Sequence, residues 1–184
     1  MAANGTKTVT INTTASATVN SGNKTIGKLS FDGQEYLIVA NIKPMLELKE
    51  IKVYVDGQKK ETVDNNDDSV NNIKPGSKLE LRFYIDNNFD NDYRYGDIDK
   101  GEVTVKFDDD SDEDDFGTEI DESEDLELDA GEDINGELVV KINVPSDAEE
   151  DTYALLIEVE GEDDNGAEHV VIWKLDLEID RIKD

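Results

Sequence analysis

Carboxylate side chains are the groups in this sequence whose spacing best suits chemistry, and that chemistry is the binding of a hard cation. Calcium takes several oxygen ligands at once, and loops rich in Asp, Asn and Glu supply them. The segment 86–99 is rich in these residues and connects two expected strands, so ligands from its two ends could converge. It predicts a calcium site made by five carboxylates: Asp86, Asp90, Asp92, Asp97 and Asp99. The alternative is an exposed polar loop that binds no ion.

A second acidic segment, from Asp108 to Glu119, superficially matches the spacing of a helix-loop-helix calcium loop. Such a loop requires glycine at the position where this sequence has Glu113. No helical pattern flanks the segment. We therefore interpret its run of like charges as a solvated loop.

Catalytic groups are scarce. His169 is the single histidine and there is no cysteine, so the chain can assemble neither a catalytic triad nor a zinc site of histidines or thiolates. We expect His169 to be a half-exposed strand residue. Trp173 is the single tryptophan and falls in an alternating strand, which predicts a core position and leaves no aromatic groove to hold a sugar between paired carboxylates. The sequence thus predicts a protein that is not an enzyme.

The net charge excludes one class of partner. The chain has 47 acidic and 18 basic residues and a formal net charge of -29. Nucleic acid would be repelled by such a surface rather than steered toward it. A salt-adapted protein is an alternative explanation of the acidity, but arginine occurs only at Arg82, Arg94 and Arg181 and lysine supplies the other basic residues. We expect a salt-adapted chain to avoid lysine.

The chain has no candidate for a membrane span, because it contains no apolar run of about 18 residues. Its first residues, Met1 to Gly5, lack the basic and apolar regions of a secretory signal. Either the protein is cytosolic or its signal peptide is absent from this chain, and we expect the second. Three glycosylation sequons, at Asn4, Asn12 and Asn23, agree with an extracellular location, although a Thr-rich and Asn-rich stretch also produces them by chance.

Strands with a period of two dominate the chain from residue 45 onward. In the run from Leu79 to Ile85 the apolar side chains share one face, and the same period returns in 138–144 and 155–159. Short turn-rich connections separate these strands. Residues 45–184 therefore predict an all-β protein, an antiparallel immunoglobulin-like β-sandwich of about seven strands.

Residues 1–44 differ in composition from the rest of the chain and form a separate Thr/Asn-rich N-terminal segment. The run Thr8 to Ile11 has the composition of a strand but too little apolar surface for a core of its own. Farther on, Asp32-Gly33 lies between two strand-like runs and suits a tight turn. The segment therefore predicts an additional β segment with a β-hairpin.

Four motifs together resemble a known family. They are Ile73 to Leu79 with its Pro-Gly turn, Ile85 to Asn88, Leu126 to Glu132 with its Ala-Gly turn, and Val144 to Tyr153. This series is similar to the CARDB-like modules of bacterial and archaeal secreted and S-layer-associated proteins, and most closely to small acidic surface proteins of small-genome archaea. The resemblance covers roughly residues 46–180, and it departs from the family at Asp151, where a glycine is usual.

The resemblance implies an exported protein with a structural or adhesive role at the cell surface. We expect a subunit of a surface layer or filament, or a module of a surface assembly, that associates with itself or with other surface proteins. In its sharper form, the segment containing Thr8 to Ile11 adds as a strand to the sheet of the next subunit. The alternative is a monomeric adhesin or binding module with calcium sites in its acidic loops.

Overall fold

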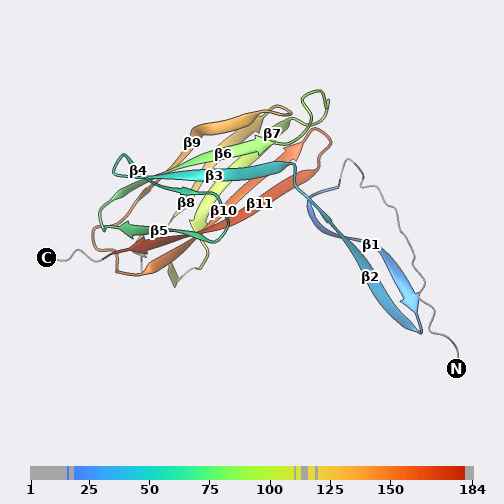
Figure 1. Cartoon of the computed structure of the whole chain (residues 1–184), viewed down its shortest axis with the longest axis horizontal. Coiled ribbons are helices and arrows are strands. Elements are labelled where there is room, and N and C mark those ends of the chain that lie inside the picture. The colour runs from blue at the N-terminus through green and yellow to red at the C-terminus, as the bar shows by residue number, and fades with distance from the viewer. Residues whose placement is uncertain (1–15, 17–18, 110, 113–115, 119, 181–184) are drawn as a thin grey trace.

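The computed structural model describes residues 16, 19–109, 111–112, 116–118 and 120–180. These residues form eleven strands, of which nine build two facing sheets and two form a separate hairpin (Figure 1). The strands are β1 (Gly22–Phe31), β2 (Gln34–Ile42), β3 (Leu46–Val55), β4 (Gln58–Val63), β5 (Asp68–Ile73), β6 (Lys78–Asn87), β7 (Ile98–Phe107), β8 (Asp121–Leu128), β9 (Asp133–Asn143), β10 (Thr152–Asp163) and β11 (Glu168–Ile179).

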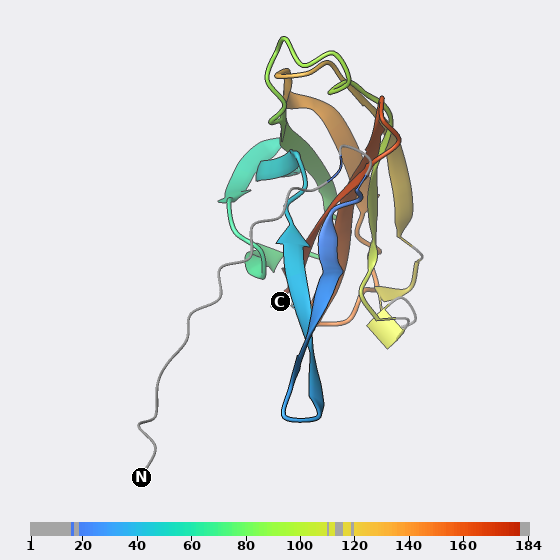
Figure 2. The ribbon, with the colours of Figure 1, turned by 90° about the vertical axis from the view of Figure 1, so that its right-hand side faces the viewer.

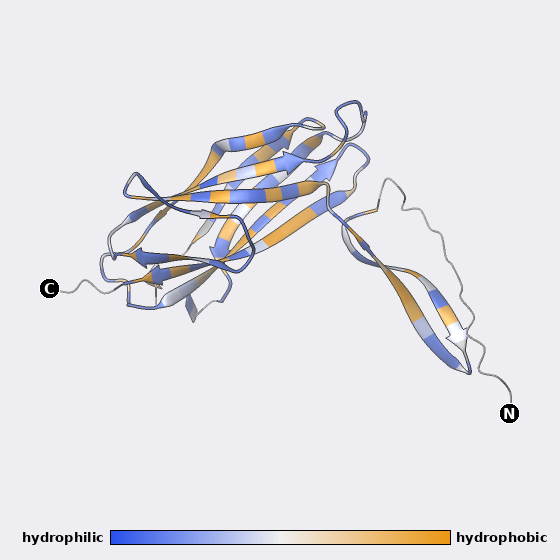
Figure 3. Cartoon of the chain, in the orientation of Figure 1, coloured by the Kyte–Doolittle hydropathy of each residue, from blue (hydrophilic) through white to orange (hydrophobic). Residues whose placement is uncertain are grey.

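The two large sheets face each other as a sandwich. One has the strand order β5-β11-β10-β7-β8 and the other β4-β3-β6-β9. Strand β6 shows why they pack: Leu79, Leu81, Phe83 and Ile85 are buried, and the residues between them are not. The same alternation appears along most strands as bands of colour in Figure 3. The predicted all-β sandwich is confirmed.

The order of the strands is that of an immunoglobulin-like fold. The series β3-β6-β9 and β11-β10-β7 match the A-B-E and G-F-C strands of such sandwiches. A tyrosine corner accompanies this order: Tyr153, near the start of β10, is 1% exposed, and its hydroxyl donates to the backbone carbonyl of Glu149 at 3.1 Å. Immunoglobulin-like folds place a tyrosine with this bond near the start of the F strand, which corresponds to β10.

Two short strands were not expected from the sequence. The described part of the sandwich has nine strands, β3 to β11, against the about seven predicted. In β4 only Val63 is buried, and in β5 only Val70 and Ile73, because both strands lie at sheet edges and show little alternation. Strand β5 also pairs with β11 in parallel, so the sandwich is not purely antiparallel.

The buried core lies between the sheets, within residues 46–179. Phe83, Val140 and Ile157 belong to it, as predicted. Trp173 is different: it is only partly buried and packs against the edge of the cluster. The reason is that β5 pairs with β11 only from Leu175 onward, so that no described strand covers the edge of β11 beside Trp173.

The hairpin β1–β2, called the arm below (residues 22–42), stands away from the sandwich at the end where β11 begins (Figures 1 and 2). Its turn is Asp32-Gly33, as predicted, with φ angles of 50° and 76°. Positive φ at both central residues is the geometry of a type I′ turn, whose twist matches that of the flanking strands. The pairing runs from Gly22 opposite Ile42 to Phe31 opposite Gln34.

Candidate functional site

The arm exposes apolar side chains that a soluble domain ordinarily buries. Among the described residues, eight large apolar side chains are exposed, and five of them lie on the arm. They are Ile26 (40%), Leu29 (49%), Tyr36 (51%), Leu37 (60%) and Val39 (52%). An isolated two-stranded hairpin is at best marginally stable in water, and a group of exposed apolar residues marks an interaction site. The arm is therefore the candidate functional site.

Apolar side chains occupy both faces of the arm. Leu29 pairs with Tyr36, so their side chains share one face. Leu37 and Val39 lie on the other face, opposite Lys28 and Thr25. Packing one face against its own sandwich would leave the other face exposed. At least one face of the arm is therefore free to contact another molecule.

Both ends of the arm are anchored at the start of β11. Before β1, the Ser21 amide donates to the Glu168 carbonyl at 2.8 Å, and the Val170 amide donates to Ser21 Oγ at 3.1 Å. Asn20 adds two hydrogen bonds to Glu168, through its amide nitrogen and its amide oxygen. After β2, the Met45 amide donates to Nδ1 of His169 at 3.2 Å. The root of the arm is thus fixed, although its tip is not covered by the described residues.

His169 is buried, contrary to the half-exposed position expected from the sequence. It is 5% exposed and meets the ring of Phe89 edge to face. Because Nδ1 accepts the Met45 amide, the neutral ring carries its proton on Nε2, which lies 3.3 Å from Oδ2 of Asp163. Asp163 also accepts the backbone amides of Asn165 and Ala167. This histidine is thus a structural link between the arm and the last hairpin, β10–β11.

The five carboxylates predicted to bind calcium do not come together in one place. Asp86 pairs with Lys49 at 3.2 Å, and this hydrogen bond raises the pKa of Lys49. Asp97 accepts the backbone amide of Ala130 at 2.8 Å. The other three, Asp90, Asp92 and Asp99, are exposed. Among the described residues, which include this whole loop, no group of three or more acidic or histidine side chains could hold a metal ion. The structure does not gather the predicted ligands into a site.

A buried asparagine, Asn87, organises this loop instead. Its side-chain nitrogen donates to the carbonyls of Gly96, Leu128 and Asp129 at 2.8, 3.3 and 3.0 Å. These bonds hold the loop against the turn after β8. Sequence reasoning placed Asn87 in a motif of the resemblance but gave it no role, because two of the three carbonyls that it binds, those of Leu128 and Asp129, lie 41 and 42 residues away.

Of the three glycosylation sequons, only that of Asn23 is described. Asn23 lies on β1 and is exposed, and its side-chain oxygen accepts a hydrogen bond from Asn41 at 3.0 Å. Asn4 and Asn12 lie outside the described residues, as does the Thr8 to Ile11 strand. Glycosylation at all three positions stays a prediction.

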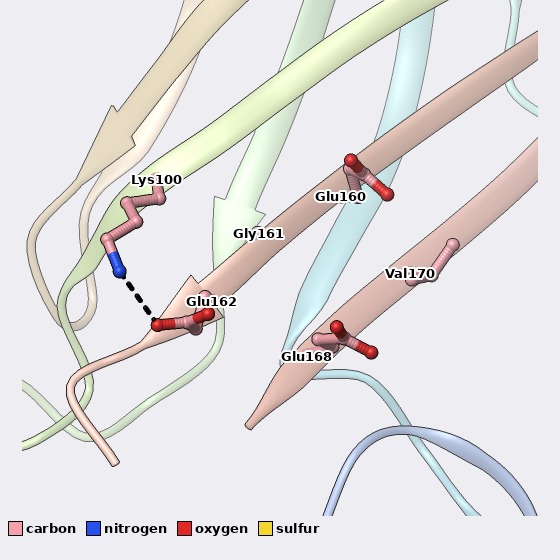
Figure 4. Close-up of a pocket in the computed structure, with 6 residues that line it drawn as sticks. All are labelled: Lys100, Glu160, Gly161, Glu162, Glu168 and Val170. Atoms are coloured by element: carbon pink, nitrogen blue, oxygen red, sulfur yellow. Dashed lines mark hydrogen bonds and ion pairs between the residues drawn. The ribbon is translucent and has the colours of Figure 1, made fainter. Parts of the chain in front are cut away.

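A shallow polar pocket of about 210 Å³ lies beside the root of the arm (Figure 4). Its lining residues are Lys100, Glu160, Gly161, Glu162, Glu168 and Val170. Lys100 and Glu162 pair with each other at 3.0 Å, and this hydrogen bond raises the pKa of Lys100. Glu168 and Val170 also anchor the arm. The pocket is therefore part of the anchoring structure, and its lining contains no histidine, serine or threonine.

The sequence indicated the hairpin but not its exposure. Alternation reveals which residues share a face of a strand, whereas coverage of that face depends on elements far away in the sequence. One signal was available: both strands of the arm carry apolar residues on both faces, which a hairpin lying on its own domain does not need.

Comparisons with known proteins identify no family. No family model matches the chain, and no curated protein matches it. Among solved structures, the chain is similar to one described as the crystal structure of the C-terminal domain of Wzt, with a TM-score of 0.46 and 10% sequence identity over 77% of each chain. A likeness this distant carries no argument about function. In the described part of the chain, no helix has the length and apolar character needed to cross a membrane.

Proposed function

We propose that the protein is an extracellular structural protein of the cell surface, which assembles with copies of itself or with other surface proteins. It would serve as a subunit of a surface layer or filament, or as a module of a larger surface assembly. The observation that carries this proposal is the arm, a hairpin that exposes Leu29, Tyr36, Leu37 and Val39 outside the sandwich.

The sandwich does not use the arm for its own core. Every member of the buried cluster lies within residues 46–179, so the arm adds no side chain to it. Apolar surface that contributes nothing to folding and is exposed to water costs solubility. Its presence on an otherwise strongly charged protein supports a role in association.

The extracellular location rests on sequence features. The four motifs resembling CARDB-like surface modules support it, and so does the sequon at Asn23, which lies on an exposed strand. Glycans on the arm of an exported protein would also limit which of its faces can be covered.

Sedimentation velocity of the full chain tests the proposal. A subunit should sediment faster as its concentration rises, and the double variant Leu37→Thr/Val39→Thr should not, because threonine keeps the β-propensity of these positions but removes apolar surface. The control Thr62→Val, at a half-buried position of β4, should behave as the wild type does. A wild-type chain that remains monomeric up to its solubility limit would contradict self-assembly. Labelling of intact cells of the source organism with antibodies against the protein tests the location.

The alternative, a monomeric binding module with calcium in its acidic loops, predicts a constant sedimentation coefficient and a loop that binds the ion. No contact among the described residues favours it, because the five predicted ligands do not form a site.

A further inference from the structure

The sandwich has a groove where its two sheets stay open on one side. The groove, called the seam groove below, has a volume of about 430 Å³. Its lining residues are Lys43, Pro44, Leu46, Glu47, Leu48, Asn88, Val171 and Trp173. They come from the first half of β3, with the residues before it, from the loop after β6 and from the first half of β11. Strand β4 pairs with β3 only from Ile51 onward, and β5 with β11 only from Leu175, which is why these halves are uncovered among the described residues.

The open edge of β11 also presents backbone groups. On the side of β11 away from β10, the backbone groups of Glu168 and Val170 form hydrogen bonds with Asn20 and Ser21, and those of Lys174 form hydrogen bonds with Asn66 and Asp67. Every second residue of a strand points its backbone groups to the same side, so the backbone N–H and C=O of Ile172 also point away from β10. No described strand pairs with Ile172 there.

In the described part of the chain, the exposed large aliphatic residues lie in two places. They are Ile26, Leu29, Leu37 and Val39 on the arm, and Ile172 on β11, whose side chain points to the opposite face of the strand from the groove-lining Val171 and Trp173. Ile172 is 51% exposed. An edge of the hairpin that pairs with β11 at Ile172 would place arm side chains beside both faces of that strand, whereas a contact between two arms would leave Ile172 and Trp173 in water.

Charge disfavours contact between two sandwiches. The arm, residues 22–42, contains two lysines, one aspartate and one glutamate, a net charge of zero, so the other residues carry the whole net charge of -29. Two sandwiches therefore repel each other. The arm of one molecule, which has no net charge, meets no such repulsion at the sandwich of another.

We infer that the arm of one molecule docks over the seam groove of a second copy, in a head-to-tail contact. This inference rests on the proposed function and names the surface that receives the arm. The apolar side chains of the arm cover Leu46, Leu48, Val171 and Trp173, and an edge of the hairpin meets the backbone of Ile172. The arm of the same molecule points away from the sandwich (Figure 1), and the bond from Met45 to His169 fixes its root.

Two full-length variants test the inference. The first, Leu37→Thr/Val39→Thr, has a weakened arm and an intact seam groove. The second, Ile172→Glu, has an intact arm and an added charge beside the open edge of β11, and its exposed position should leave the thermal unfolding of the sandwich unchanged. Tyr95→Glu, which changes an exposed aromatic residue outside the groove lining, is the matched control. Ile172→Thr serves if the glutamate variant unfolds.

Sedimentation of the variants alone and mixed distinguishes the arrangements. We expect each variant alone to lose association, the control to keep it, and the equimolar mixture to form a pair that grows no further, because one intact arm meets one intact groove. Association of Ile172→Glu at the wild-type level, or a mixture that stays monomeric, would overturn the inference while leaving self-assembly intact. A wild-type chain that never associates would contradict both the proposed function and this inference.

Trp173, the single tryptophan, reports occupation of the groove directly. Its emission should move to shorter wavelength as the wild-type protein associates, and should not move in Leu37→Thr/Val39→Thr. A wild-type emission that is unchanged between monomer and assembly would overturn the inference, since the groove would then not be covered by a second molecule.

Discussion

Individual buried polar residues connect parts of this molecule that are far apart in the sequence. His169 joins Met45, which precedes β3, to Asp163, and Asn87 joins the loop before β7 to the turn after β8. Buried polar groups are costly unless each finds a partner. The partners exist here because three or more segments meet at each residue.

Replacement of His169 by phenylalanine should weaken the root of the arm. The Met45 amide would lose its acceptor, and Asp163 would lose one partner, which costs about 1–3 kcal/mol of the free energy of unfolding. Urea denaturation measures this loss, and hydrogen exchange should show a faster Met45 amide. Glu168→Gln, at an exposed neighbour that can still accept a hydrogen bond, should change the stability by less than about 0.5 kcal/mol. An unchanged Met45 exchange rate would show that the histidine does not hold this amide.

The tyrosine corner should contribute to stability without affecting assembly. Tyr153→Phe removes the hydrogen bond to the Glu149 carbonyl but keeps the buried ring, and should lower the free energy of unfolding by about 1 kcal/mol in urea melts. Tyr36→Phe on the exposed arm is the matched control and should have no measurable effect on unfolding. Equal stability of the two variants would contradict a structural role for the corner.

At the scale of elements, the arm differs from every other hairpin in the described part of the chain. The hairpins within the sandwich have a buried face, whereas β1 and β2 pair only with each other. Without tertiary packing, their backbone hydrogen bonds should open at a small cost in free energy.

Hydrogen exchange should therefore distinguish the arm from the sandwich. In dilute solution the amides of β1 and β2 should exchange much faster than those of β10, which is the central strand of its sheet. Raising the protein concentration should slow exchange in the arm and leave β10 unchanged, because docking covers only the arm. Arm amides as slow as those of β10 at high dilution would mean that the hairpin is stable by itself and needs no partner.

The whole molecule carries a net charge of -29, which destabilises the compact state through self-repulsion. The described residues form seven ion pairs of lysine or arginine with a carboxylate, and most involve exposed lysines on the surface, so they offset little of this charge. Screening by salt should have a larger effect than any one pair.

The melting temperature should rise with sodium chloride, and calcium chloride at matched ionic strength should give a similar rise. The reason is that both salts screen the same repulsion, while the predicted calcium ligands do not converge. Asp90→Asn with Asp92→Asn should leave the difference between the two salts unchanged. A calcium effect that persists in concentrated sodium chloride and disappears in this variant would show that the loop binds the ion after all.

Local sequence determined much of this protein. The period of two in β6, β9 and β10 fixed which side chains enter the core, because successive side chains of a strand point to opposite faces. Asp32-Gly33 set the turn of the arm, since few residue pairs accept positive φ at both positions. The excess of acidic over basic residues predicts a surface that repels nucleic acid.

Tertiary structure decided which residues of those strands are packed against other parts of the chain and which are exposed. Trp173 has the alternation of a core residue, yet it lies at an open edge because the neighbouring strand β5 begins only at the level of Leu175. His169 is buried because Met45 and Asp163 fold against it. The predicted calcium ligands form no site, because Lys49 and the Ala130 amide engage two of them and the other three are exposed. Local sequence specifies the direction in which a side chain points. Whether that side chain is buried depends on residues tens of positions away that pack against it. The exposure of the arm, on which the proposed assembly depends, is therefore visible only in three dimensions.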